Sequence, residues 1–519
     1  MLTGIYNSLN AAISNVQHSH FYMAELASDD RFGGGGDNDR DMQGLDHLMN
    51  TQPDRFLSFW TARYQGIFRA NTALETLNQV TGWTTDAEFN QTLGEVHFLR
   101  ALYYFELSQM FGEVPLVTTS TVTNVPKAPS EETYAVIAQD LKTAIEIMPS
   151  TPYSSVASGH ATKWAAQALM ARVFLFFTGY YQKTDLPLAE GGSVSKAQVI
   201  QWLEDCIANS GHGLIDEFRN LWPYSNRFTK PNYPYSTANN LQYAGEGHKE
   251  TVFAVKFGTL ADCDTYILGY TNQLNLHSGL RSNNGQANTF PFGQGWGAGP
   301  VNSKLWNDWR AAEPNDIRRE GSIINADIDL QGYIYGADSQ MEETGFWQKK
   351  YIAITAYDNG ALIPSYAILA DGAQADYQLA HTQDLVLIRF ADVLLMHAEL
   401  SETATNLNRV RARVDLPAIS YSLAALKRER RWELSFEGLR YFDLMRWHDA
   451  ADALASQEGV AIKNKNVDTQ MRGFGGGYRA RYEATGGFWA IPTSQIALSN
   501  GVLTQNKGWG DAAHEYTGW

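Results

Sequence analysis

The sequence predicts a mainly α-helical protein in which helices occupy both ends of the chain and a long irregular insert separates them. Apolar residues recur every three or four positions in residues 1–209 and again in residues 384–450. Residues 210–383 are instead rich in Gly, Asn, Pro and Tyr, and residues 451–519 form a loop-rich tail. Because no Ser/Pro linker or charge run separates these parts, residues 1–519 are expected to fold as a single domain.

The N-terminal helices are expected to pair in antiparallel fashion. The apolar stripe from Val96 to Met110 advances by 3, 4, 4 and 3 positions, which marks one face of a helix. Ser130 is a good N-cap, and the acidic residues after it favour a helix start there. Small residues on one face of residues 160–180 allow close helix contact, which is typical of a tetratricopeptide-like solenoid. Helices are predicted at residues 1–27, 54–79, 86–111, 130–148, 160–180 and 195–209.

The remainder of the chain predicts short strands followed by more helix. Residues 251–257 and 346–354 have the composition of β-strands. Helical stripes return at residues 384–400, 403–413 and 422–447. No clean 34-residue self-match runs through the chain, so the solenoid is inferred from helix pairing alone.

Bulk composition excludes some functions and favours others. A net charge of −16 repels phosphate polymers, so no nucleic-acid partner is expected. Aromatic residues make up 12% of the chain, and Trp and Tyr supply flat faces on which sugar rings can pack. The chain contains no run of 18 apolar residues, so no membrane span is predicted. Cys206 and Cys263 give neither a disulfide framework nor a metal-ligand spacing, and whether they pair is left open.

Four segments resemble, in the same order, the characteristic segments of the SusD/RagB family. They are FLRALYYF and GEVPL within residues 98–116, IRFADVLLMHAE at residues 388–399, the stretch from Arg430 to Trp447, and WAIP followed by Leu503, Gln505, Asn506 and Gly508. The resemblance implies a scaffold of about four tetratricopeptide-like helix pairs. It also implies a shallow surface site that binds an oligosaccharide or, less often, a peptide, and that catalyses no reaction.

The same resemblance implies a location and a partner. Members of this family are surface-exposed lipoproteins of the outer membrane that deliver their ligand to a SusC-like TonB-dependent transporter. An N-terminal lipid anchor is therefore expected, although the sequence contains neither a signal peptide nor a lipid-bearing cysteine at its start. No cofactor is expected.

Two loops are expected to form the ligand site: the first ligand loop, residues 28–41, and the second ligand loop, residues 279–299. Sugar sites combine exposed aromatic faces with Asp, Asn and Arg side chains, each of which can bond to two adjacent hydroxyls. The first loop carries such side chains on a flexible glycine backbone. In the second loop, Trp296 is the best aromatic candidate because glycines flank it. In the SusD/RagB family, loops at these two places commonly contribute to the site. The predicted ligand-binding residues are Asp29, Asp30, Arg31, Asn38, Asp39, Arg40, Tyr224, Asn283, Asn284 and Trp296.

The charges within residues 428–447 allow two interpretations. Arg430, Glu433 and Glu437 share a helix face, where they could be catalytic acids or part of an ion-pair network. Pairing with Arg440 and Asp443 across turns would satisfy them. The network is favoured, because buried charges are costly unless they are paired.

A calcium loop is the one metal motif that the first ligand loop suggests. Asp37, Asp39 and Asp41 alternate as at the start of an EF-hand, but Met42 and Leu48 stand where that motif needs Gly and Glu. An EF-hand is excluded, a looser calcium site is left open, and no metal ligand is predicted.

Two other functions remain open at this point. A helical glycoside hydrolase would need two carboxylates about 5–10 Å apart in an aromatic cleft. A helical-repeat scaffold for peptides or proteins would instead present a long concave groove.

Overall fold

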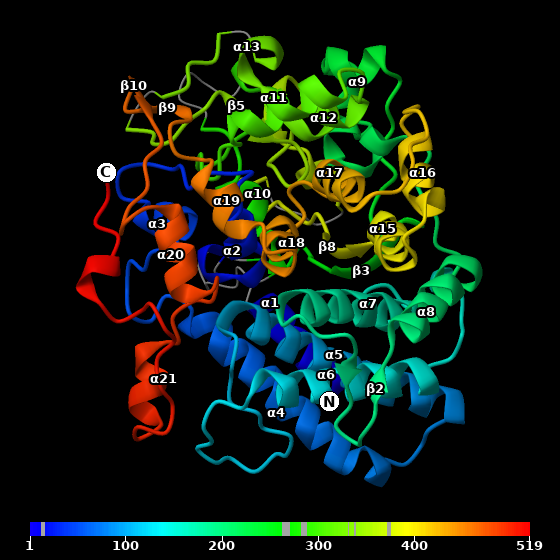
Figure 1. Ribbon diagram of the computed structural model, residues 1–519. Coiled ribbons are helices and arrows are strands. Elements are labelled where there is room, and N and C mark those ends of the chain that lie inside the picture. The colour runs from blue at the N-terminus through cyan, green and yellow to red at the C-terminus, as the bar shows by residue number, and fades with distance from the viewer. Residues whose placement is uncertain (12–15, 262–269, 282–287, 331, 337–338, 371–374) are drawn as a thin grey trace.

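Antiparallel helices build the N-terminal part of the chain, in the lower half of Figure 1. The computed structural model describes residues 1–11, 16–261, 270–281, 288–330, 332–336, 339–370 and 375–519. Neighbouring helices pack in chain order, α4 on α5, α5 on α6, α6 on α7 and α7 on α8, while α1 also lies against α4. These helices are α1 (Leu2–Ala11), α4 (Leu57–Thr76), α5 (Asp86–Phe111), α6 (Ser130–Ile147), α7 (Lys163–Tyr180) and α8 (Lys196–Asn209). Two short helices, α2 (His20–Leu26) and α3 (Arg40–Asp46), lie above them in Figure 1.

Side-chain caps fix where several of these helices begin. The hydroxyl of Thr85 accepts the backbone N–H of Glu88 (3.1 Å) at the start of α5, and Gly112, with a φ of 70°, ends that helix. The hydroxyls of Thr162 and Ser195 cap α7 and α8 in the same way. At α6 the capping position is Pro129 rather than Ser130, which is the first helical residue. The helices predicted between residues 54 and 209 are confirmed with small shifts at their ends, whereas residues 1–27 contain two helices, α1 and α2, and a 3₁₀ turn at Val16–His18.

The insert is a body of short helices and two-stranded antiparallel sheets, in the upper half of Figure 1. The strand predicted at residues 251–257 is present, whereas only three residues of 346–354 are strand. A short hairpin of β1 (Leu186–Pro187) and β2 (Ser193–Val194) precedes the insert. The elements of the insert are α9 (Pro234–Ala238), β3 (Thr251–Val255), α10 (Gln273–His277), α11 (Ser303–Ala312), α12 (Ile317–Ser322), β4 (Ile323–Asn325), α13 (Ala326–Asp329), β5 (Phe346–Gln348), β6 (Thr355–Asp358), β7 (Ala361–Pro364) and α14 (Tyr366–Leu369).

The helix predicted at residues 384–400 begins instead as a strand. β8 (Leu385–Arg389) pairs antiparallel with β3, so that Val255 lies opposite Leu385, and α15 (Phe390–Ser401) follows directly. Residues 385–389 form a strand because β3 lies beside them in the folded chain. The edge of β3 offers backbone hydrogen-bond partners, which the local sequence pattern does not reveal.

The helix predicted at residues 422–447 is broken in the middle. α17 (Leu423–Glu433) ends, and α18 (Arg440–Arg446) begins after Phe436 and Gly438 adopt φ values of 63° and 73°. A side chain at Gly438 would place its Cβ 2.7 Å from the ring of Phe21, so close packing favours glycine there. The remaining elements are α16 (Ala404–Ala412), α19 (Ala450–Ala455), β9 (Ala461–Asn464), β10 (Val467–Gln470), α20 (Tyr478–Thr485) and α21 (Thr493–Leu498).

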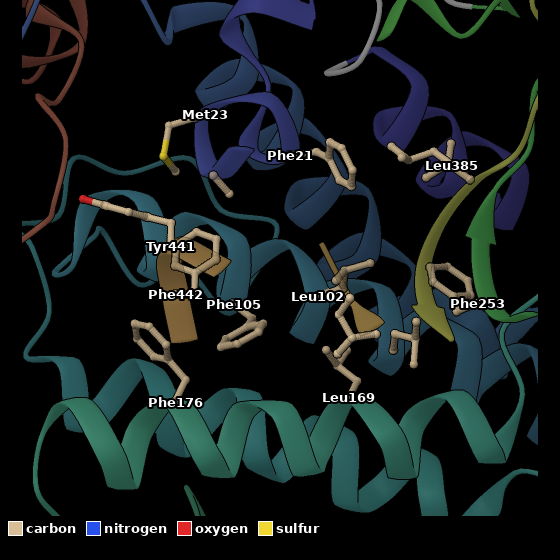
Figure 2. Close-up of a cluster of buried hydrophobic side chains, with 14 of the residues drawn as sticks. Phe21, Met23, Leu102, Phe105, Leu169, Phe176, Phe253, Leu385, Tyr441 and Phe442 are labelled. Atoms are coloured by element: carbon tan, nitrogen blue, oxygen red, sulfur yellow. The ribbon is translucent and has the colours of Figure 1, made fainter. Parts of the chain in front are cut away.

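A contiguous apolar core joins the scaffold to the insert. Figure 2 shows the part of it where α2, α5, α7, α18 and the β3–β8 pair meet. Phe176 packs edge to face against both Phe105 and Phe442, with ring centroids 6.1 and 6.0 Å apart. Among the described residues, no helix combines the length and the apolarity that crossing a membrane requires.

The charges of α17 and α18 form a buried ion-pair network, as favoured from the sequence. Arg430 donates to Asp443 (2.9 Å) and to Asp392 (2.7 Å), and Glu433 accepts from arginines outside its own helix. The adjoining cavity measures about 60 Å³, which holds about two waters. Arg440 does not join this network; it reaches the first ligand loop instead. The network fixes the packing of the helices and lies away from solvent.

Candidate functional site

The two predicted ligand loops lie side by side and are joined by backbone hydrogen bonds. The N–H of Gly35 donates to the carbonyl of Gly297 (3.0 Å), and the N–H of Gly299 donates to that of Gly33 (2.9 Å). The glycine run of the first loop is therefore paired backbone rather than the flexible segment that its composition suggested. Left-handed φ values at Gly34, Gly35, Gly297 and Gly299 allow this close approach.

A third segment, residues 340–342, holds the first ligand loop from its other side. Gly36 forms a bridge with Gln340, and the N–H of Met341 donates to the carbonyl of Gly35 (2.8 Å). The carboxylate of Glu342 accepts the N–H of Gly34 (2.9 Å). Sequence reasoning missed this segment, because no local pattern marks it as a neighbour of residues 300 positions earlier.

Trp296 presents an exposed aromatic ring where the loops meet. The residue is 40% exposed, yet its backbone N–H is fixed by the carbonyl of Leu276 (2.9 Å). The ring of His277 meets it edge to face, with centroids 4.6 Å apart and an interplanar angle of 66°. Burial lowers the pKa of His277 to about 3, so this support is uncharged at neutral pH. Trp296 is thus a positioned platform with an open face.

Polar side chains border this platform. Arg281 donates from Nε to the carbonyl of Trp296 (2.8 Å), and its Nη2 lies 3.4 Å from Oδ2 of Asp39. Both side chains of this ion pair are about one-third exposed. Asn38 and Arg40 are exposed in the same loop. We call Trp296, Arg281 and Asp39 the Trp296 surface; Trp296 and Asp39 were predicted from the sequence, as were the exposed neighbours Asn38 and Arg40.

Asp29 and Asp30 were predicted to bind ligand, but both are buried and ion-paired. Asp29 accepts two bonds from Arg440 (2.7 and 2.9 Å), and Asp30 accepts one from Arg431 (2.7 Å). Burial alone would raise the pKa of Asp29, but the charges of Arg431 and Arg440 lower it below the usual range. These carboxylates anchor the first ligand loop to α17 and α18 and have no face open to a sugar.

Arg31 and Tyr224 were also predicted to bind ligand, but both side chains are buried. Arg31 is 3% exposed and bonds to Glu25 (3.1 Å) and to the carbonyl of Gly299 (2.9 Å). Tyr224 is fully buried, and its hydroxyl donates to the carbonyl of Gly321 (2.9 Å). Both side chains lie in the interior of the protein and do not line its surface.

Asn283, Asn284 and Cys263 lie outside the described residues. Cys206 is buried in α8. The alternating acids of the first ligand loop each have a different partner, and among the described residues they do not form a group of three converging ligand atoms. The partners of Asp37, Asp39 and Asp41 include Lys465, Arg281 and Gln52, respectively.

A Gly34→Ala variant is expected to lose stability. The φ of Gly34 is 67°, and an added Cβ would lie 2.4 Å from Cδ of Pro300. Left-handed backbone and a forced shift of the neighbouring loop together should lower the free energy of unfolding by about 2 kcal/mol. Urea denaturation followed by circular dichroism measures this change. Gly258→Ala is the matched control, because open space surrounds Gly258; equal losses in both variants would contradict the loop pairing.

A second polar region holds two neighbouring carboxyl groups, Glu246 and Asp384. Glu246 lines a pocket of about 550 Å³ and accepts hydrogen bonds from the hydroxyls of Tyr243 and Tyr366. The backbone N–H of Asp384 donates to Glu246 (3.1 Å), and the carboxylate of Asp384 pairs with Lys256. Burial, and then the charge of Asp384, raise the pKa of Glu246 to about 7.

Glu246 makes the stability of the protein depend on pH. Its pKa is higher in the folded than in the unfolded chain, so the folded state binds the extra proton and stability falls as pH rises from about 4.5 to about 7. A Glu246→Gln variant should lose this slope and gain up to about 3 kcal/mol relative to wild type between pH 5 and pH 8. Denaturation curves at both pH values measure the difference; parallel behaviour of the two proteins would refute the shift.

Comparisons with known proteins agree on one family. The model of the family described as "Starch-binding associating with outer membrane" matches residues 2–175, and that of the "SusD family" matches residues 311–509. A "SusD-like protein P2" of Formosa agariphila is 25% identical over 415 residues, which cover 75% of this chain and 71% of the relative.

Solved structures share the fold along nearly the whole chain. A "Laminarin binding SusD-like protein" is 25% identical, with a TM-score of 0.73 and 98% of each chain covered. A surface glycan-binding protein A from Bacteroides thetaiotaomicron, solved with laminarihexaose, is 21% identical with a TM-score of 0.74 and the same coverage. The predicted helical fold is therefore confirmed, and the chain belongs to the SusD/RagB family that its four sequence segments resemble.

Proposed function

We propose that this chain is a non-catalytic glycan-binding protein of the outer-membrane surface, which delivers oligosaccharide to a SusC-like TonB-dependent transporter. The observation that carries this proposal is the Trp296 surface. Its exposed ring offers an apolar face to the C–H groups of a sugar, and Arg281 and Asp39 offer donors and acceptors to the hydroxyls.

The chemistry of this surface favours a neutral glycan. The chain carries a net charge of −16, and the guanidinium of Arg281 is already paired with Asp39. Laminarin is the first ligand to test, because a relative with 25% identity is described as binding it. A shallow surface of this kind is expected to bind with a dissociation constant of about 10⁻⁵ to 10⁻³ M. Weak binding suits a protein that must release its ligand to a transporter.

Two observations support the absence of catalysis. The acids of α17 and α18 are paired with arginines in the interior, and the carboxylate of Asp384 is paired with Lys256. Buried acids that are paired with arginines are not accessible to the glycosidic bond that a hydrolase must reach.

Binding and catalysis are tested together on the wild-type chain. A glycan array that includes laminarin identifies ligands, and calorimetry measures their affinity. Prolonged incubation with each ligand should release no new reducing ends. Binding without new reducing ends supports the proposal; new reducing ends, or no binding to any glycan, would overturn it.

Delivery and location are tested in the producing organism. Deleting the gene should abolish growth on the bound glycan while growth on glucose continues. Surface labelling of intact cells should reach the protein, and it should co-purify with a SusC-like transporter from the outer membrane. Unchanged growth on the glycan would argue against a role in uptake.

A further inference from the structure

Behind the first ligand loop, three potential metal ligands meet in the interior of the protein. Asp46 is the last residue of α3, His47 follows it, and Glu342 comes from the insert. One ligand atom from each lies within 4.8 Å of the other two. All three residues are at most 1% exposed. None of them touches the Trp296 surface by a hydrogen bond among the described residues.

The imidazole ring of His47 has no hydrogen-bond partner. Both ring nitrogens of His47 are buried and unsatisfied, as is Oδ1 of Asp46. Nε2 of His47 points toward Oε1 of Glu342 but stays 3.4 Å away, beyond the usual hydrogen-bond range of about 2.7–3.2 Å. Buried polar atoms are almost always satisfied in folded proteins, so this arrangement points to a missing partner.

The two carboxylates also lack a balancing cation. Asp46 accepts from the hydroxyl of Tyr478 (3.1 Å), and Glu342 accepts from Gly34 and from the indole of Trp519 (2.6 Å). Within the described part of the chain, neither carboxylate forms an ion pair with a lysine or arginine.

Aromatic rings enclose the cluster. Phe474 and Tyr516 lie 4.6 and 5.3 Å from the ring of His47, centroid to centroid, and Tyr478 and Trp519 complete the wall. This wall keeps the imidazole in place and excludes bulk water. An ionised carboxylate in such a setting is costly unless a positive charge lies close by, because water does not screen it.

We propose that Asp46, His47 and Glu342 bind a divalent metal ion of the zinc class. An imidazole combined with carboxylates suits Zn²⁺ better than the all-oxygen shells of Ca²⁺ and Mg²⁺. Ligand atoms of a tetrahedral Zn²⁺ lie about 3.3 Å apart, given metal–ligand distances of about 2.0–2.1 Å. The 3.4 Å between His47 and Glu342 matches that spacing. The ion would satisfy the imidazole and balance both carboxylates at once.

The ion would brace the first ligand loop from behind. Oε2 of Glu342 holds the N–H of Gly34, and Oε1 holds the indole of Trp519 near the C-terminus. Fixing this carboxylate therefore links α3, the insert, the loop and the tail. Its role is structural, and it does not depend on the identity of any glycan.

The experiment uses the full chain after treatment with a chelator and desalting. Calorimetry with Zn²⁺ should show one equivalent bound per chain, and Zn²⁺ should raise the midpoint of thermal unfolding. Co²⁺ as a spectroscopic probe should give the strong visible absorption of a four-coordinate site. Ca²⁺ should bind more weakly than Zn²⁺.

Variants locate the ion. His47→Gln and Asp46→Asn should each weaken Zn²⁺ binding by at least about 100-fold. His381→Gln is the control, because His381 is equally buried but belongs to no cluster of this kind among the described residues. Failure of the wild type to bind one equivalent of Zn²⁺ would overturn the proposal, as would wild-type affinity in both cluster variants. Because the readouts are metal binding and thermal stability, their failure would leave the glycan proposal intact.

Discussion

A Glu433→Gln variant is expected to be destabilised by about 3–5 kcal/mol, the range for breaking a buried ion pair from one side. Glu433 is completely buried and pairs with three arginines, Arg318, Arg389 and Arg413. Burial alone would raise the pKa of Glu433, but those three charges lower it below the usual carboxyl range. A neutral amide would leave the guanidinium groups without their shared counter-ion.

Urea denaturation at neutral pH measures this loss as a lower midpoint. The control is Glu402→Gln, which removes an exposed ion pair with Lys196. Exposed pairs contribute little, so the control should unfold together with the wild type. If Glu433→Gln unfolded at the wild-type midpoint, the network would have no role in holding α17 against the insert.

The Trp296→Ala variant is expected to lose detectable retention by the cognate glycan. The open face of this ring is the main apolar surface that the Trp296 surface offers a sugar. Removing such an anchor costs about 2–4 kcal/mol of binding, or about 30-fold or more in affinity. The fold should be unaffected, because the ring is 40% exposed. Affinity electrophoresis in glycan-containing gels, followed by calorimetry, gives the comparison.

Phe68→Ala is the matched control for this experiment. Phe68 is 47% exposed on α4, outside both ligand loops. Its removal should leave retention unchanged. Equal retention of wild type and Trp296→Ala would place the glycan elsewhere on the molecule, and a loss in both variants would indicate a nonspecific effect of exposed aromatic rings.

The helical scaffold could be predicted because its information is local. The stripe from Val96 to Met110 and the cap at Thr85 both lie within or beside α5, and the helix occupies the predicted residues 86–111. The predicted secondary structure was wrong where segments distant in the sequence pair with, or pack against, the residues concerned. β8 is a strand because β3 pairs with it, and α17 stops because Phe436 and Gly438 adopt left-handed backbone in contact with other elements.

The candidate site was predicted only in part, and the reason lies in burial. Asp29 and Asn38 belong to the same loop and are both small and polar. Asp29 meets Arg440, which is 411 positions away in the chain, and becomes an anchor, whereas Asn38 stays exposed. Residue type and loop membership give no means of separating the two.

The sequence by itself determined the family, the paired helices and the two loops in which aromatic and polar side chains gather. These features depend on the spacing and identity of neighbouring residues. Only the tertiary structure decided which loop residues face solvent and which hold the loop down, and only it brought Glu342 to Asp46 and His47. Such outcomes depend on long-range packing and on the high free-energy cost of leaving a buried charge unpaired.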